Sequence, residues 1–140
     1  MFTLGVLLAA NAFAATPEET VRQAFLSYGR TAETLFAGYR ILDRNYTYDF
    51  HNHLFLKDTP LITNYRAAAL QKINEARLLR AAADSQAAAA RSTLGAGDPL
   101  AALLDEVREF LAYNFDRAPV LERMSGEFEQ TQAGLQHAAH

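Results

Sequence analysis

The sequence predicts an all-α protein that folds as a single-domain bundle of about four helices. Apolar residues recur at intervals of three and four over long stretches, the spacing that places side chains on one face of a helix. Thr or Asp stands directly before Pro at three points along the chain, a pattern typical of helix starts. The chain has 140 residues and half of them are hydrophobic, which is enough for one core.

Residues 1–15 resemble the end of a secretory signal peptide, so residues 16–140 are expected to form the mature domain. Leu4 to Ala10 form a short apolar run, and Ala12-Phe13-Ala14 fits the small-x-small pattern before a cleavage point. The segment lacks the basic residues of a typical signal, and the alternative is an apolar first turn packed on the bundle. The signal interpretation predicts a periplasmic or secreted protein. No transmembrane span is expected in the mature chain, because that needs about 20 apolar residues.

The first long helix is expected to begin at Thr16-Pro17-Glu18-Glu19 and to run to about Asn45. Thr16 can cap the helix, Pro17 suits its first position, and Glu19 can complete a capping box. Gly29 and Gly38 lie inside it, where they allow either close packing or a kink. The apolar stripe has a period near 3.6 and consists of Val21, Phe25, Tyr28, Ala32, Leu35, Phe36, Tyr39, Leu42 and Tyr46.

The segment from Tyr46 to Lys57 departs from the helical pattern. Its residues largely alternate between apolar and polar, and a period of two indicates an extended segment. Because a single strand without a partner is marginally stable, we expect an ordered crossover with aromatic anchors.

Residues 60–94 are expected to form a long Ala-rich helix around which the fold is organised. Thr59 can cap it, and Pro60 suits its first position. Because its apolar seam is mostly alanine, a partner helix can approach to the low end of about 8–10 Å between axes. The seam consists of Ile62, Tyr65, Ala69, Ile73, Ala76, Leu79, Ala83, Ala87, Ala90 and Leu94.

The chain then turns at residues 95–99 and forms two more helices. Gly95 or Gly97 can take a left-handed cap, while Asp98 and Pro99 open the third helix. This helix has a wide apolar face, made of Leu100, Leu103, Leu104, Val107, Phe110, Leu111 and Asn114. Pro119 is expected to end or kink it. The last helix has a weaker stripe of Val120, Met124, Phe128, Thr131 and Leu135. Met124 is expected to fill the core.

Charge is distributed unevenly along the chain. The net charge is −3, which gives no reason to expect nucleic acid as a partner. Residues 60–97 carry five cations and two acids, whereas residues 98–140 carry eight acids and three arginines. The simplest explanation is that these segments are neighbours and attract each other, at about 0–1 kcal/mol for each exposed pair. A charged external partner is the alternative.

Few residues are arranged for catalysis. The chain has no cysteine, which excludes disulfides, thiolate metal sites and a cysteine nucleophile. No serine lies in a G-x-S-x-G or S-x-x-K motif. Asp105, Glu106 and Glu109 are interpreted as a solvated helix face rather than general acids or bases. We therefore predict no catalytic residue.

Asp49, His51 and His53 form the one group whose composition resembles a metal site. In an extended segment these alternate residues project to the same side, and three such ligands could hold zinc or another divalent ion. The alternative, which we favour, is that they are exposed polar positions in a loop whose aromatic residues pack inward. His137 and His140 lie at the end of the chain, where a solvated role is expected. Apart from this divalent metal, no cofactor is predicted.

These observations favour a non-enzymatic exported protein that acts through protein–protein contact in a cell-envelope or secreted assembly. Its partner would be another protein or a second copy of itself. The predicted contact surface consists of Tyr46, Tyr48, Phe50 and Phe55, since exposed aromatic residues outside a core often mark interfaces. Long Ala-rich hairpins also occur in coiled-coil proteins of the cell envelope, a similarity of composition alone. The alternative function is a small-ligand or divalent-metal-binding bundle that uses the Asp49–His53 segment.

Overall fold

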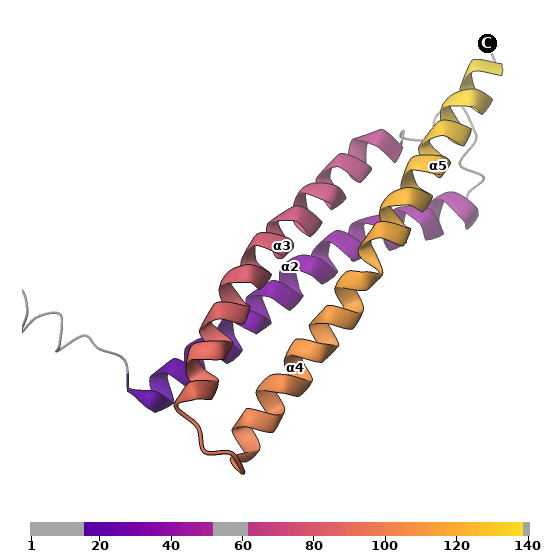
Figure 1. Cartoon of the computed structure of the whole chain (residues 1–140). Coiled ribbons are helices and arrows are strands. Elements are labelled where there is room, and N and C mark those ends of the chain that lie inside the picture. The colour runs from indigo at the N-terminus through magenta and orange to yellow at the C-terminus, as the bar shows by residue number, and fades with distance from the viewer. Residues whose placement is uncertain (1–15, 52–61, 139–140) are drawn as a thin grey trace, which may run out of the picture.

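The computed structural model describes residues 16–51 and 62–138, and these ranges contain helices and no strand. The helices are α2 (Pro17–His51), α3 (Ile62–Ser92), α4 (Pro99–Asp116) and α5 (Ala118–Ala138). α3 runs antiparallel to α2, and α4 and α5 then return along the pair (Figure 1). Because only Arg117 separates α4 from α5, the four helices form three rods. The predicted all-α bundle is confirmed.

The predicted signal segment, residues 1–15, lies outside the described residues, and so does the Thr59-Pro60 cap. Within the described ranges, no helix contains an apolar stretch of the length that crossing a membrane requires.

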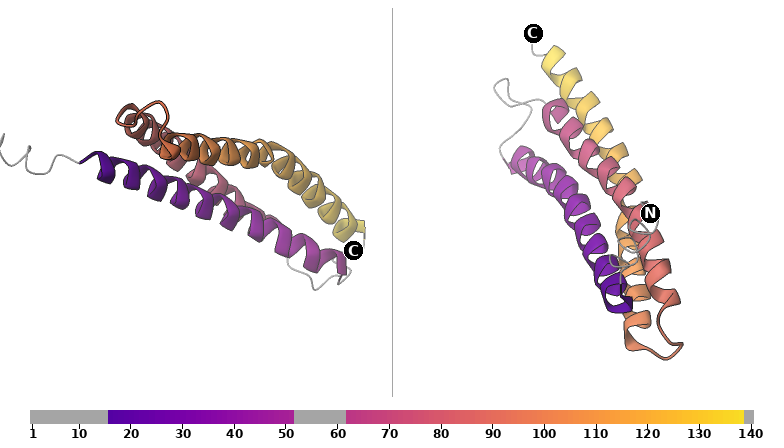
Figure 2. Two further views of the ribbon diagram at one scale, coloured as in Figure 1. Left: turned by 90° about the horizontal axis from the view of Figure 1, so that it is seen from below. Right: turned by 90° about the vertical axis from the view of Figure 1, so that its left-hand side faces the viewer.

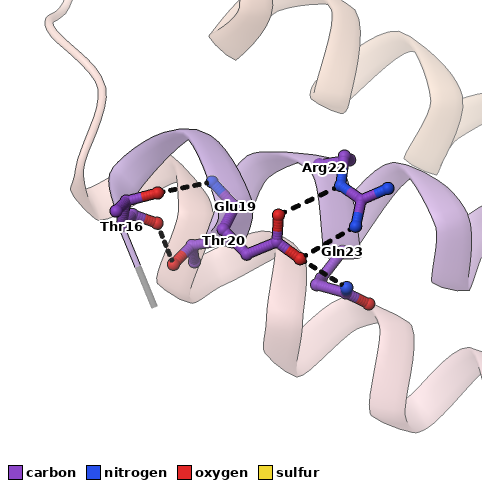
Figure 3. Close-up of polar contacts among 5 residues, drawn as sticks. All are labelled: Thr16, Glu19, Thr20, Arg22 and Gln23. Atoms are coloured by element: carbon purple, nitrogen blue, oxygen red, sulfur yellow. Dashed lines mark hydrogen bonds and ion pairs between the residues drawn. The ribbon is translucent and has the colours of Figure 1, made fainter. Parts of the chain in front are cut away.

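α2 begins where the sequence predicts, through a polar network in its first turns (Figure 3). Thr16 Oγ1 accepts a hydrogen bond from the Glu19 backbone N–H at 3.2 Å, so Thr16 caps the helix. The Glu19 carboxylate turns forward, where it accepts hydrogen bonds from Arg22 at 3.0 and 3.1 Å and from Gln23 at 2.8 Å. These bonds, above all those from Arg22, lower the pKa of Glu19 to about 2. One hydrogen bond of the predicted capping box is therefore present, the one from the Glu19 backbone N–H to Thr16. The Glu19 carboxylate, which was expected to supply the other, instead binds Arg22 and Gln23.

α2 and α3 pack closely along the Ala-rich seam. The buried seam residues of α3 are Ala69, Ile73, Ala76, Ala83, Ala87 and Ala90, and those of α2 include Ala24, Tyr28, Leu35 and Leu42. Gly38 explains the close approach, because a Cβ there would lie 2.9 Å from Ile73 Cγ1 and 3.0 Å from the Ala69 carbonyl oxygen. A Cβ added at Gly29 would instead meet open space. Of these two glycines, Gly38 is therefore the one that permits close packing.

α2 continues six residues beyond the predicted end at Asn45, to His51. The prediction of an extended segment is therefore wrong for residues 46–51. Aromatic residues alternate with polar ones there, which is the pattern of a strand. A long helix that has already formed gains one backbone hydrogen bond for each residue added, and this favours continuing the helix through a short alternating stretch. Residues 52–57, the rest of that segment, lie outside the described residues.

The turn between α3 and α4 forms without a left-handed glycine. Neither Gly95 nor Gly97 has a φ in that region, so the predicted cap is wrong. The last turn of α3 tightens instead, with Thr93 N–H bonded to the Ala90 carbonyl and Leu94 N–H to that of Arg91, each at 3.1 Å. The start of α4 agrees with prediction. Asp98 Oδ1 accepts the Leu100 N–H at 2.9 Å, and Pro99 occupies the first helical position.

α4 and α5 form one rod with a change of direction at their junction (Figure 2). Pro119 has no N–H to donate to the carbonyl four residues earlier. Arg117 therefore forms a single turn, with its N–H bonded to the Asn114 carbonyl at 3.3 Å, and the helix resumes at Ala118. Pro119 bends the rod rather than ending it.

The apolar faces predicted for α4 and α5 are only partly buried. Leu104 and Leu111 are buried as expected, whereas Leu103 and Phe110 are exposed. Among the α5 side chains that the structure describes, Ala118 and Ser125 are buried and Met124 is 46% exposed, so the prediction that Met124 fills the core is wrong. One side of the rod formed by α4 and α5 packs against α2 and α3. The apolar face of the rod is wider than this contact, so part of it remains exposed.

Ion pairs link α3 to the third rod. Arg91 pairs with Asp105, Arg77 Nη2 lies 2.5 Å from Glu122 Oε1, and Arg66 Nη1 lies 3.3 Å from Glu129 Oε2. Arg66 Nε also donates to the buried Ser125 hydroxyl oxygen at 3.0 Å. The opposite net charges of these segments therefore face each other, as the simplest explanation predicts.

Candidate functional site

The main candidate site is a line of seven exposed residues along α4 and α5, here called the α4–α5 stripe. Its members are Leu103, Glu106, Phe110, Tyr113, Arg117, Val120 and Met124. They follow one another at alternating intervals of three and four, so they lie along one side of the rod. Five are apolar or aromatic, with exposed fractions of 44% for Leu103, 55% for Phe110, 69% for Tyr113, 47% for Val120 and 46% for Met124.

The stripe is exposed because α4 uses its other flank to pack. Leu104, Leu111 and Phe115 are buried against α2 and α3. Arg80 of α3 fixes this flank, with its guanidinium carbon 4.8 Å from the centre of the Phe115 ring. Leu103 and Phe110 each precede one of the buried leucines by one residue, so they project to the side of the contact. The apolar surface of α4 is therefore wider than its two neighbours cover.

A groove between α2 and the third rod lies beside the stripe. It has a volume of about 780 Å³, and its apolar lining comes from Phe36, Tyr39, Leu42, Leu121 and Met124. Arg40, Asp43 and Arg117 add charge to the lining. Phe110 joins stripe and groove, since its ring centre lies 6.2 Å from that of Phe36.

Tyr39 closes the floor of this groove. It is 8% exposed, and its hydroxyl donates a hydrogen bond to the Asn114 carbonyl oxygen. Arg117 stands above the ring, with its guanidinium carbon 6.0 Å from the ring centre. Burial raises the pKa of the Tyr39 phenol. At neutral pH the phenol therefore remains a hydrogen-bond donor that ties α2 to α4.

A second, polar cleft of about 570 Å³ lies nearer the turn between α3 and α4. Tyr28 donates to Asp84 Oδ1 at 2.9 Å, and Arg80 Nε lies 3.8 Å from Asp84 Oδ2. Asp105 is paired with Arg91 and with Arg108, whose Nη2 lies 3.6 Å from Asp105 Oδ1.

These polar contacts give the charged and phenolic side chains of the cleft a structural role, because each of them is bonded to another residue of the protein. Burial, and then the bond to Asp84, raises the pKa of the Tyr28 phenol far above its ordinary range, so the phenol is not a nucleophile at neutral pH. Both carboxylates already have cationic partners. Asp105, which the sequence places on a solvated face, is half-buried and paired, while Glu106 and Glu109 are exposed as predicted. The cleft joins three helices and contains no activated group.

The residues predicted as sites lie at the end of α2 or beyond it. Tyr46, Tyr48, Asp49, Phe50 and His51 belong to its last turns. His53 and Phe55 lie outside the described residues. In the ranges that the structure describes, no three His, Cys, Asp or Glu residues are grouped so that they could hold a metal ion.

Both predictions for this segment remain untested. The metal hypothesis assumed that Asp49 and His51 belong to an extended segment, and α2 is helical at both positions. Positions two apart do not share a face of a helix, so that part of its geometric basis is lost.

The sequence interpretation missed the α4–α5 stripe because it assigned Leu103, Phe110 and Met124 to the core. The width of the apolar face was the signal that could have revealed it. A helix that packs on one side has an apolar arc a little over 100° wide. Adjacent residues are about 100° apart on the helix, so pairs such as Leu103 with Leu104 already fill such an arc, and the aromatic Tyr113, three residues after Phe110, widens the face beyond it.

Comparisons with protein-family models, with curated proteins and with solved structures found no match for this chain.

Proposed function

We propose that this protein is a non-enzymatic, exported helical protein that acts through protein–protein contact in a cell-envelope or secreted assembly. The observation that supports this best is the α4–α5 stripe, a line of seven exposed side chains of which five are apolar or aromatic. Single exposed apolar residues are normal on a protein surface, but continuous apolar patches mark binding sites.

The composition of the stripe also supports a contact surface. Phe, Tyr, Met and Arg are enriched in protein interfaces, and the stripe contains Phe110, Tyr113, Met124 and Arg117. The aromatic pair is central in the stripe, where residues that dominate binding energy usually lie. Export remains supported by the signal-like residues 1–15.

Site-specific photo-cross-linking in the cells that produce the protein tests this proposal. A photoreactive phenylalanine analogue replaces Tyr113 in the stripe, and in a control chain it replaces Leu78. Leu78 is 77% exposed on α3 and does not belong to the stripe, so the two positions are matched in exposure. We expect a covalent adduct from position 113 and none from position 78, in an exported fraction whose mature chain begins near Thr16.

Two results would overturn the proposal. If position 113 gives no adduct, or if both positions give the same adducts, the stripe is not a specific contact surface. If the adduct forms on an unprocessed chain in the cytoplasm, the exported part of the proposal is wrong. Mass spectrometry of the adduct identifies the partner.

A further inference from the structure

We propose that the partner is a second copy of this chain, bound with its α4–α5 rod antiparallel to that of the first. This inference rests on the proposed function, because it names the partner of the same stripe. It follows from a symmetry in the order of the stripe residues.

The spacing of the stripe reads the same in both directions. From Leu103 to Val120 the intervals are three, four, three, four and three. A line of this kind coincides with its own reversed copy when a two-fold axis passes midway between Leu111 and Ala112. Two-fold dimers use the same patch on both subunits, so a patch that matches its own reversal is the pattern they require.

The side chains brought together by this axis are complementary in kind. Leu103 meets Val120 of the partner subunit, two apolar residues of similar size. Phe110 meets Tyr113 of the partner subunit, so two aromatic pairs lie beside the axis. Aromatic pairs of this kind contribute binding free energy beyond that of the apolar area they bury. Leu103, Phe110, Tyr113 and Val120 are all exposed in the single chain, so each has surface available for the contact.

The charges select the same alignment. Glu106 meets Arg117 of the partner subunit, and the symmetry makes this pair twice. A parallel alignment would instead place Glu106 against Glu106 and Arg117 against Arg117. Opposed like charges disfavour the wrong partner orientation. Glu106 and Arg117 are exposed and lie on the stripe itself. Any dimer that buries the apolar residues of the stripe therefore also brings these two charges against residues of the partner subunit.

The length of the match is adequate for a helix–helix interface. Residues 103–120 span about 26 Å at 1.5 Å per residue, and most of this length lies in α4, before the change of direction at Arg117. Met124 extends the apolar line towards the start of α4 in the partner, where Leu100 is 42% exposed. The alternation of three and four is also that of heptad a and d positions, which place knobs into holes.

Disulfide cross-linking between engineered cysteines tests the alignment, and the absence of natural cysteine makes the result unambiguous. One chain carries Leu103→Cys and another carries Val120→Cys. We expect a disulfide dimer when the two chains are mixed under mild oxidation. Each chain alone should give none, because like positions would be separated by about 26 Å in the antiparallel dimer.

A charge exchange supplies a second measurement that does not depend on cysteine. Glu106→Arg and Arg117→Glu each turn two attractive pairs into repulsive ones. We expect each single variant to raise the dimer dissociation constant about tenfold or more, and the double exchange to restore it. Sedimentation equilibrium measures the constant, and circular dichroism verifies that each variant keeps its helix content.

The outcomes separate this inference from the proposed function. Cross-linking of each cysteine chain with itself would show a parallel alignment and overturn the inference, as would failure of the double charge exchange to restore association. A monomer in every experiment, with a Tyr113 photo-adduct to a different protein, would also overturn the inference but leave the proposed function standing. No adduct and no dimer would overturn both.

Discussion

The α2–α3 interface and the α4–α5 rod use apolar residues in opposite ways. Between α2 and α3 many of the contact residues are small, and Gly38, Ala69, Ala76, Ala83 and Ala90 are all buried. Along α4 and α5 the residues are larger, and Leu103, Phe110, Tyr113, Val120 and Met124 remain about half exposed or more. Residue hydrophobicity therefore does not decide burial here. Small side chains let two helices approach until the seam is closed, whereas no helix within residues 16–51 and 62–138 covers one flank of the wide α4 face.

The difference also divides stability from binding. Buried residues at a closed interface contribute to folding through transfer from water and dense packing. Apolar residues left exposed in the single chain contribute to folding less, and their burial remains available for association. The first region should therefore determine the free energy of unfolding, and the second should determine the affinity for a partner.

The largest expected effect comes from replacing the same residue type in both regions. Leu35→Ala should lower the free energy of unfolding by about 2–5 kcal/mol, because Leu35 is fully buried and its removal leaves a cavity. Leu103→Ala should lower it by about 1 kcal/mol or less, since Leu103 is 44% exposed. Urea unfolding at low protein concentration measures both values without a contribution from association. Equal losses from the two variants would contradict the proposed division.

An intermediate effect is expected from two glycines of the same helix. Gly38→Ala should lower the free energy of unfolding by about 1–3 kcal/mol, because the new methyl group would press on Ile73 and on the Ala69 backbone. Gly29→Ala should raise it by up to about 1 kcal/mol, since its Cβ meets open space and alanine favours the helix. Thermal unfolding measures both, and effects of the same sign would show that close approach is not what Gly38 provides.

The smallest effect concerns the start of α2, away from both regions. The pKa of Glu19 is about 2 in the folded chain, against 4.5 for an ordinary glutamate. Because the folded value is the lower one, the stabilisation by this carboxylate is present above pH 4.5 and is lost as the pH falls towards 2. NMR titration should show the low midpoint, and Arg22→Ala should move it upward by removing its main partner. A midpoint near 4.5 in the unaltered chain would show that these bonds do not hold the carboxylate.

The sequence was sufficient for the helices and for the seam. Periodicity located α2, α3 and α4, and the Thr16 and Asp98 caps marked two starts correctly. Local chemistry determines these features, so local reasoning finds them. The end of α2 was placed too early because the alternation around Tyr48 and Phe50 resembled a strand, although a helix already under way continues at little cost.

The candidate site was harder to predict because exposure depends on how many neighbours a helix has. Nothing local distinguishes Leu104, which is buried, from Leu103, which is not. That distinction requires the position of α4 against α2 and α3. The same holds for Met124, which lies one residue before the buried Ser125. A single apolar face read from the sequence can thus serve two purposes, one for folding and one for binding.

The alanine seam has a consequence for how α2 and α3 are aligned along their length. Ala69, Ala76, Ala83 and Ala90 are seven residues apart, so sliding α3 by two turns, about 10 Å, would move one alanine of α3 into the place of the next. Among the described residues, the contacts that favour one position include Ile73 against Gly38, Tyr28 donating to Asp84, and Ser27 donating to Gln86. A slide would separate the Tyr28 hydroxyl from its acceptor Asp84 and lose this hydrogen bond, which is worth about 1 kcal/mol. These contacts therefore set the register of a surface that is otherwise repetitive, as a single polar residue can do in a coiled coil.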